Sequence, residues 1–246
     1  MGSKLGFGWA CLLTSLMVLA TEVGGQVKAF LKVWKEACEW KGRARVLIPP
    51  GSYKVNSVRF EGPCKGWVGV VIGGFLKAPA DPSMFSTDSW INFRYVDLLT
   101  VGGGGTLDAQ GQVAWGLNDC SKNSNCPRLP TTLRFDFVTN ARIHHVRSMN
   151  SKNNHIVLFG CENVNTSHIR ISAPADSPNT DWIKIRSSHR IGISRSTIES
   201  LDIALVPVRE LLHRKTLAPA KSDRHIGCGG GMAFTASPPP LALHPL

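Results

Sequence analysis

The hydrophobic pattern changes its period once along the chain. From residue 27 to residue 38 the apolar positions recur at intervals of three and four, with lysines on the opposite side: Val27, Phe30, Leu31, Trp34 and Cys38. This spacing predicts an amphipathic helix. Beyond it, short apolar runs alternate with polar positions and are interrupted by Gly and Pro, as in Pro49-Pro50-Gly51, which predicts short β-strands joined by turns. We therefore expect a single N-terminal helix followed by an all-β body.

A weak repeat runs through the β body. Each copy begins with a polar residue and continues with alternating apolar positions up to a turn, and the copies start at Asp97, Asn140, Asn163 and His189. The last three starts are 23 and 26 residues apart, which suits one coil of a parallel β-helix with a strand on each of three faces. Stacked coils bury each other's inward residues, and the leading helix would cover the end of the stack. A β-sandwich with evenly spaced strands is the alternative.

The first 25 residues have the pattern of a secretory signal. Lys4 supplies a positive start, residues 7–20 are mainly apolar, and small residues from Ala20 to Gly25 provide a cleavage site. The apolar run is short for a membrane span, although an N-terminal anchor is the alternative. No later stretch is long and apolar enough to span a membrane. We expect residues 1–25 to be a signal peptide and the mature protein to be secreted, without a membrane partner.

Export bears on the cysteines. Without Cys11 an even number remains, which suits disulfides in an oxidising compartment, and the sequence leaves their pairing open: Cys38, Cys64, Cys120, Cys126, Cys161 and Cys228.

The histidines lack metal-ligand spacing, so we expect neither a metal site nor a cofactor: His144, His145, His155 and His168. Asn165-Thr166-Ser167 is an acceptor sequon for N-glycosylation at Asn165.

The formal net charge of +11 suits an acidic partner. In an exported protein this partner is an acidic polysaccharide, a membrane surface or extracellular nucleic acid, and simple solubility is the alternative explanation. The basic residues are scattered and lack the aromatic interleaving of a nucleic-acid reader. We therefore expect no nucleic-acid partner.

A collinear series of motifs covers roughly residues 29–198. It includes Phe60-Glu61-Gly62-Pro63-Cys64, Gly103-Gly104-Gly105-Thr106-Leu107-Asp108 and Ser177-Pro178-Asn179-Thr180-Asp181. In this order the motifs resemble the plant-type polygalacturonases, including the exopolygalacturonases of pollen. The resemblance implies an all-β, right-handed parallel β-helix over residues 26–207, and hydrolysis of the α-1,4 links of galacturonan, the acidic backbone of pectin.

The resemblance also implies which carboxylates act. An inverting glycosidase needs a carboxylic acid and a carboxylate base about 6.5–9.5 Å apart. Adjacent coils are about 4.8 Å apart, so carboxylates on neighbouring coils with a sideways offset reach that separation. Asp181 is the carboxylate of the family's Asn-Thr-Asp segment. Asp202 lies one coil later in a shortened form of its Gly-Asp-Asp segment, and the sequence leaves open which of the two is the acid.

Several departures from the family pattern bear on activity. Trp182 occupies a position that is glycine in the family, and its indole either blocks the approach to Asp181 or packs into the coil. Lys184 stands where histidine is common. The family's Gly-His-Gly and Arg-Ile-Lys segments are not found, and the likeness stops after Pro207. We expect an incomplete β-helix and a divergent, irregular tail over residues 208–246.

These features leave several functions open. The first is a secreted, monomeric hydrolase of pectin in the cell wall, with Asp181 and Asp202 as its carboxylates. The alternatives are a non-catalytic wall protein that binds acidic polysaccharide through its basic surface, a truncated product without function, or a lyase on the same fold. A hydrolase releases reducing ends from polygalacturonic acid, whereas a lyase forms unsaturated ends that absorb in the ultraviolet.

Overall fold

The computed structural model describes residues 23–118, 123, 125–174, 177 and 182–199. It begins with helix α1 (Val23–Glu39), and the elements that follow are almost all short strands. Helix α2 (Gln112–Trp115) and a 3-10 turn (Pro82–Met84) lie in the connections. Within the described residues, no helix has the length and apolar character needed to cross a membrane.

The strands form three sheets, named A, B and C here, in which all neighbouring strands are parallel. Sheet A contains β1 (Ala44–Ile48), β4 (Val68–Ile72), β7 (Leu99–Gly102), β10 (Thr139–His144), β13 (Glu162–Ser167) and β16 (His189–Ser194). Sheet B contains β2 (Ser52–Lys54), β5 (Phe75–Lys77), β8 (Thr106–Asp108), β11 (Arg147–Met149), β14 (Arg170–Ser172) and β17 (Thr197–Glu199). Sheet C contains β3 (Val58–Glu61), β6 (Ser89–Arg94), β9 (Thr131–Asp136), β12 (Ile156–Phe159) and β15 (Ile183–Arg186).

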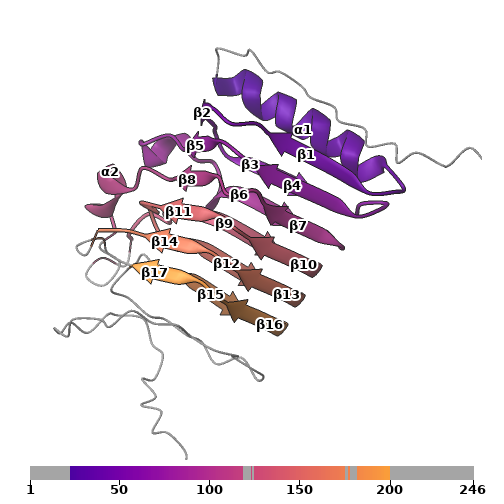
Figure 1. Cartoon of the computed structure of the whole chain (residues 1–246). Coiled ribbons are helices and arrows are strands. Elements are labelled where there is room, and N and C mark those ends of the chain that lie inside the picture. The colour runs from indigo at the N-terminus through magenta and orange to yellow at the C-terminus, as the bar shows by residue number, and fades with distance from the viewer. Residues whose placement is uncertain (1–22, 119–122, 124, 175–176, 178–181, 200–246) are drawn as a thin grey trace, which may run out of the picture.

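Strands that are neighbours in a sheet are three strands apart in the chain, so each coil contributes one strand to each sheet and the next coil stacks on it (Figure 1). This arrangement confirms the predicted parallel β-helix. The connections differ in length: those from A to B are short, whereas those from B to C reach residues 109–130. The long connections place irregular segments beside the start of sheet C.

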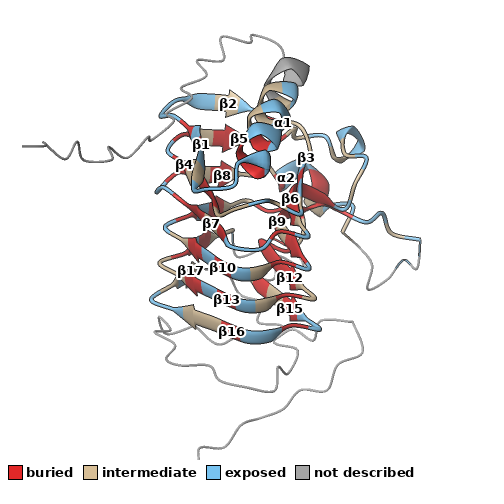
Figure 2. Cartoon of the chain, turned by 90° about the vertical axis from the view of Figure 1, so that its right-hand side faces the viewer, coloured by how far each residue is buried: buried red, intermediate tan, exposed pale blue. Residues whose placement is uncertain are grey.

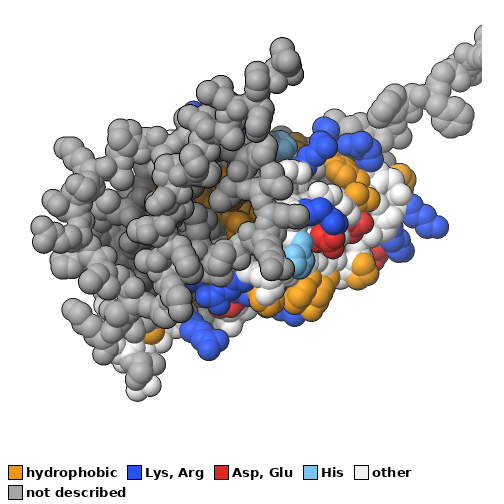
Figure 3. Space-filling view, turned by 90° about the horizontal axis from the view of Figure 1, so that it is seen from below, with side chains coloured by type: hydrophobic (Ala, Val, Ile, Leu, Met, Phe, Trp, Pro, Cys, Tyr) orange, Lys and Arg blue, Asp and Glu red, His pale blue; other side chains and the backbone are white. Residues whose placement is uncertain are grey.

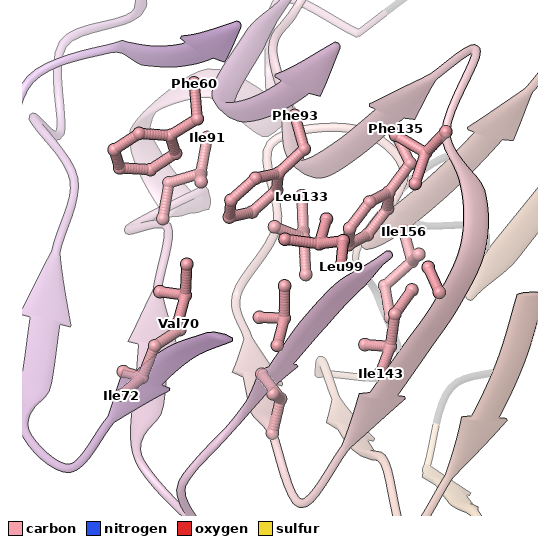
Figure 4. Packing of buried hydrophobic residues seen from close by; sticks show 14 of the residues in the cluster. Phe60, Val70, Ile72, Ile91, Phe93, Leu99, Leu133, Phe135, Ile143 and Ile156 are labelled. Atoms are coloured by element: carbon pink, nitrogen blue, oxygen red, sulfur yellow. The ribbon is translucent and has the colours of Figure 1, made fainter. Parts of the chain in front are cut away.

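The interior is filled by apolar side chains that stack from coil to coil, because identical registers bring like positions together. Phe60, Phe93 and Phe135 are in register on β3, β6 and β9, and their ring centroids are 5.0 and 5.4 Å apart (Figure 4). Offset stacking of this kind adds about 0.5–1.5 kcal/mol per pair to the burial of the rings. Buried positions line the inner faces of the sheets, and the exposed ones face outward (Figure 2).

Helix α1 covers one end of this stack, as the sequence predicted (Figure 1). Trp34 is buried with its ring centroid 5.0 Å from that of Phe60, and its Nε1 donates a hydrogen bond to the Glu61 carbonyl (2.9 Å). The Cys38–Cys64 disulfide fixes the end of the helix to the chain after β3. Leu31, which the spacing placed on the apolar side, is exposed.

The cysteines follow the disulfide expectation in part. Cys38 and Cys64 are paired, and Cys126 is also disulfide-bonded. Cys161 is instead a free, buried thiol whose Sγ lies 3.4 Å from the Phe135 carbonyl, and burial raises the pKa of this thiol. Its position inside the stack explains why it has no partner among the described residues. Cys120 and Cys228 lie outside the described residues.

Candidate active site

Both predicted catalytic carboxylates, Asp181 and Asp202, lie outside the described residues, as does the tail over residues 208–246. The residues that flank the Asn-Thr-Asp segment are described. Ser177 is buried, and both its backbone N–H and its Oγ donate to the Pro174 carbonyl, at 3.0 and 2.7 Å. On the other side, Trp182 leads directly into β15. The segment therefore connects a tight turn after β14 with the first residues of sheet C.

The N-terminal ends of β9, β12 and β15 lie side by side in sheet C. Ile156 pairs with Ile183, and its N–H donates to the Trp182 carbonyl (2.9 Å), so His155 and Trp182 take neighbouring positions. One coil earlier, the Leu133 N–H donates to the His155 carbonyl (3.0 Å). Thr132, His155 and Trp182 thus form a column along the solenoid, beside the first residues of β15.

Buried polar side chains line the junction between sheets B and C at this column. Ser148 Oγ lies 2.8 Å from His155 Nδ1, and Thr132 Oγ1 donates to Ser151 Oγ (2.8 Å). Ser151 Oγ in turn donates to the Asn154 carbonyl (2.8 Å). Hydroxyl groups therefore connect the polar residues of neighbouring coils, which satisfies most of their hydrogen-bonding capacity in the interior.

Three polar atoms at the column have no hydrogen-bond partner in the part of the chain that the structure describes: Asn154 Oδ1, His155 Nε2 and Trp182 Nε1. His155 has an exposed fraction of 0%, and burial lowers its pKa to about 3, so its imidazole is neutral at mildly acidic and neutral pH. A neutral, fully buried imidazole can accept or donate a hydrogen bond but cannot serve as a cationic binder of a carboxylate. Sequence reasoning gave His155 no role, because its burial follows only from the coil.

Trp182 and Lys184 marked the departures from the family pattern. Trp182 is half-buried and packs against the hydrophobic core, which is the second of the two arrangements the sequence allowed. Lys184 lies on β15, in register with Val157 of β12, on the outward positions of sheet C.

A charged cluster on the outer face of sheet C was missed by the sequence analysis. Arg134 Nε donates to both carboxylate oxygens of Asp136 (2.8 and 3.0 Å), and its Nη1 donates to Asp88 Oδ2 (2.8 Å). Asn92 Nδ2 donates to Asp136 Oδ2 (2.8 Å). Asp136 is only 7% exposed, and the contact with Arg134 offsets the charge of this carboxylate within the sheet. Arg134 and Asp136 are 2 residues apart on one face of β9, whereas Asp88 is 46 residues from Arg134 and is brought near it only by stacking of the coils.

Lys152 is a second residue whose environment no motif indicated. Its side chain is 1% exposed, and its Nζ donates to the carbonyls of Pro79 (2.7 Å), Ala109 and Gln110 (3.4 Å). Burial lowers the pKa of Lys152 to about 8, partly offset by the charge of Asp108. The ammonium group holds together three long connections from sheet B to sheet C.

Asn165, the predicted glycosylation site, is exposed on the outer face of β13, while Thr166 of the sequon points inward and is buried. Its glycosylation stays a prediction. In the described ranges there is no group of three His, Cys, Asp or Glu side chains placed to hold a metal ion.

Comparison with known proteins places this fold and these motifs in a family. The family model of glycosyl hydrolases family 28 matches residues 38–209. The chain is 44% identical over 184 residues to an exopolygalacturonase from Platanus acerifolia, covering 74% of this chain and 49% of that protein. It is 41% identical over 175 residues to a polygalacturonase from Gossypium barbadense, covering 71% of this chain and 43% of that protein.

Among solved structures, endo-xylogalacturonan hydrolase from Aspergillus tubingensis matches with a TM-score of 0.58 and 24% identity, over 72% of this chain and 47% of that chain. This match supports the fold. The chain spans about half the length of the curated relatives it matches. These matches confirm the resemblance inferred from the motifs, and the chain belongs to the glycosyl hydrolases of family 28.

Proposed function

We propose that this protein is a secreted glycoside hydrolase that cleaves the α-1,4 links of galacturonan in pectin of the cell wall. The observation that carries the proposal is the family match over residues 38–209, together with the position of the Ser177–Asp181 motif directly before β15. In the chain the motif directly precedes β15, which lies beside β12 and β9 in sheet C.

In this proposal Asp181 and Asp202 supply the acid and the base of an inverting reaction. One carboxylic acid protonates the leaving glycosidic oxygen, and the other carboxylate takes a proton from the water that attacks the opposite face of the sugar. Arg186 is an exposed cation on the outer face of β15 and suits a carboxylate of a uronate chain. Neutral His155 contributes a hydrogen-bonding group to the junction between sheets B and C.

The test is release of new reducing ends from polygalacturonic acid by the purified full chain. We expect release, and a loss of about 100-fold or more in rate for Asp181→Asn and for Asp202→Asn, because each removes a proton donor or acceptor. Asp81→Asn is the matched control: Asp81 is exposed, and its carboxylate accepts a hydrogen bond from the Ser83 N–H, a capping role that Asn also fills. No release by the wild-type chain would refute the hydrolase.

The alternative is a non-catalytic protein that binds acidic polysaccharide, which the net charge of +11 favours. Binding to polygalacturonic acid without release of reducing ends would establish it. Appearance of ends that absorb in the ultraviolet would instead establish a lyase. Export is tested separately, by sequencing the N-terminus of protein recovered from the culture medium, where cleavage near residue 25 is expected.

A further inference from the structure

The corner between sheets A and B carries a concentration of positive charge. We define the AB corner as residues 142–147, 165–170 and 192–197. In each of these segments the chain leaves a strand of sheet A, turns and enters the next strand of sheet B. Asp and Glu are absent from these three segments, and four arginines in them are exposed: Arg142, Arg147, Arg170 and Arg195. Lys and Arg side chains also lie at several points around the described part of the face seen from the β16 end (Figure 3).

Among the described residues, the arginines of the AB corner have no carboxylate partner, unlike Arg134 and Arg190. Arg134 is held by Asp88 and Asp136, and Arg190 pairs with Glu162. Across the described ranges, no ion pair involves an arginine of the AB corner. Four exposed guanidinium groups are therefore available to an external anion.

Two of these arginines are direct neighbours in the sheet. Arg147 of β11 and Arg170 of β14 are paired residues of adjacent parallel strands, at a strand separation of about 4.8 Å. Like charges directly opposite one another destabilise a sheet. A bound anion between them would relieve that repulsion, and arginine can bind a carboxylate through two parallel hydrogen bonds.

Histidines extend the same surface along the stack. The rings of His145 and His168 are stacked at 4.5 Å between centroids with an interplanar angle of 8°, and His144 Nδ1 lies 3.2 Å from His145 Nδ1. The preceding coil has glycines here: His144 lies against Gly102, and a Cβ added at Gly104 would meet no atom within 4 Å. The corner is thus a ridge of basic side chains that follows the solenoid axis beside an open glycine turn.

We propose that the AB corner binds a chain of acidic polysaccharide, at a site separate from the carboxylate motif. A uronate polymer carries one carboxylate on every sugar along its length, which suits cations repeated on successive coils. In a three-sided coil the AB corner lies opposite sheet C. One polymer can therefore bind at the corner while another binds at sheet C. The choice of polymer rests on the proposed function, since both sites would take galacturonan.

Other polyanions fit this surface less well. A protein surface that binds a membrane combines basic residues with large apolar side chains that insert between lipids. The outward side chains of the AB corner are instead basic or small and polar. Single-stranded nucleic acid is bound through free aromatic faces, whereas the His145 and His168 rings stack on each other.

The test compares two double variants that each remove two positive charges. Arg147→Gln/Arg170→Gln changes the AB corner, and Lys32→Gln/Lys35→Gln changes exposed positions of α1, where Gln has a similar helix propensity. Binding to immobilised polygalacturonic acid is measured by surface plasmon resonance at 50 and 200 mM NaCl. All chains carry Asp181→Asn so that the polymer is not degraded, and thermal unfolding monitored by circular dichroism checks their folding.

We expect the corner variant to bind about tenfold more weakly at 50 mM NaCl, since hydrogen bonds to charged groups are lost, and the α1 variant to bind within twofold of the parent. Equal weakening of both variants, or of neither, overturns the proposal. So does stronger corner-dependent binding to phosphatidylserine vesicles or to single-stranded DNA than to the polysaccharide. Hydrolysis is scored separately on the wild type: corner-dependent binding without hydrolysis refutes only the proposed function, and hydrolysis without corner-dependent binding refutes only this proposal.

Discussion

Stability of this protein should fall as the pH falls from 7.5 to 5.5, and His155 should account for a defined part of the loss. The imidazole is fully buried beside Ser148, and burial lowers its pKa from 6.5 to about 3. Below pH 6.5 the unfolded chain takes up a proton at this residue, while the folded chain does not until about pH 3. His155 therefore does not lower the stability of the folded protein above pH 6.5. Below pH 6.5 the stability falls with the pH, because protons bind to the unfolded state and favour it.

The magnitude follows from the two pKa values. Proton uptake by the unfolded state lowers the stability by almost nothing at pH 7.5 and by roughly 1 kcal/mol at pH 5.5, so the expected loss of stability is about 1 kcal/mol. The folded state contributes almost nothing to this difference, since both pH values lie well above a pKa of about 3. Other titrating groups add their own terms, so the part due to His155 requires a variant.

The assay is urea unfolding of the wild type and of His155→Gln at both pH values. Gln does not titrate and retains an amide for the hydroxyl of Ser148, so the variant should be less stable overall but lose about 1 kcal/mol less than the wild type between pH 7.5 and 5.5. His189→Gln, at an exposed position of β16, is the control for the substitution of a histidine by Gln.

An equal loss of stability in the wild type and in His155→Gln would refute the reasoning. It would mean that water or a rearrangement of the coil lets the folded protein take up the proton at this position. A wild-type loss of stability confined to pH values below about 4 would also refute the reasoning, because the unfolded chain would then not take up the proton below pH 6.5.

Three further results are expected for the fold. Cys38→Ser/Cys64→Ser should lower the free energy of unfolding by about 3 kcal/mol, because the disulfide closes a loop with a sequence separation of 26. Urea unfolding of this variant and of the wild type without reductant measures the loss and leaves the disulfide at Cys126 intact, and no change would indicate that α1 is held by packing alone. Phe93→Ala should cost about 3–5 kcal/mol, since Phe93 lies between two other rings, whereas Phe137→Ala on the surface should cost far less in the same titration. Lys152→Met should lower stability by about 1–3 kcal/mol by leaving buried carbonyls unpaired, and an unchanged urea midpoint would contradict that role.

The imperfect repeat in the sequence has a physical explanation in the structure. The short turns from A to B keep nearly constant length, and they account for the regular starts at Asn140, Asn163 and His189. The connections from B to C vary from residues 55–57 to residues 109–130, so earlier coils depart from that spacing. A period count therefore detects the later coils and underestimates how far the solenoid extends toward α1.

Local sequence determined which residues point inward and where the chain turns. Alternation of apolar and polar positions requires only the geometry of a strand, and the three-and-four spacing of α1 requires only the geometry of a helix. The collinear motifs, including the one that ends in Asp181, likewise indicated the family, and the matched relatives confirmed it. None of these inferences depends on which coil lies next to which.

Only the tertiary structure decided the contacts between coils. Lys152 meets the Pro79 carbonyl across 73 residues, Arg134 meets Asp88 across 46, and His155 loses its contact with water because neighbouring coils close over it. The unpaired arginines of the AB corner likewise become one surface only through the register of β11 and β14. The energies of charged and polar groups depend on their surroundings in space, and those surroundings are set by the stacking of the whole solenoid rather than by neighbours in the chain.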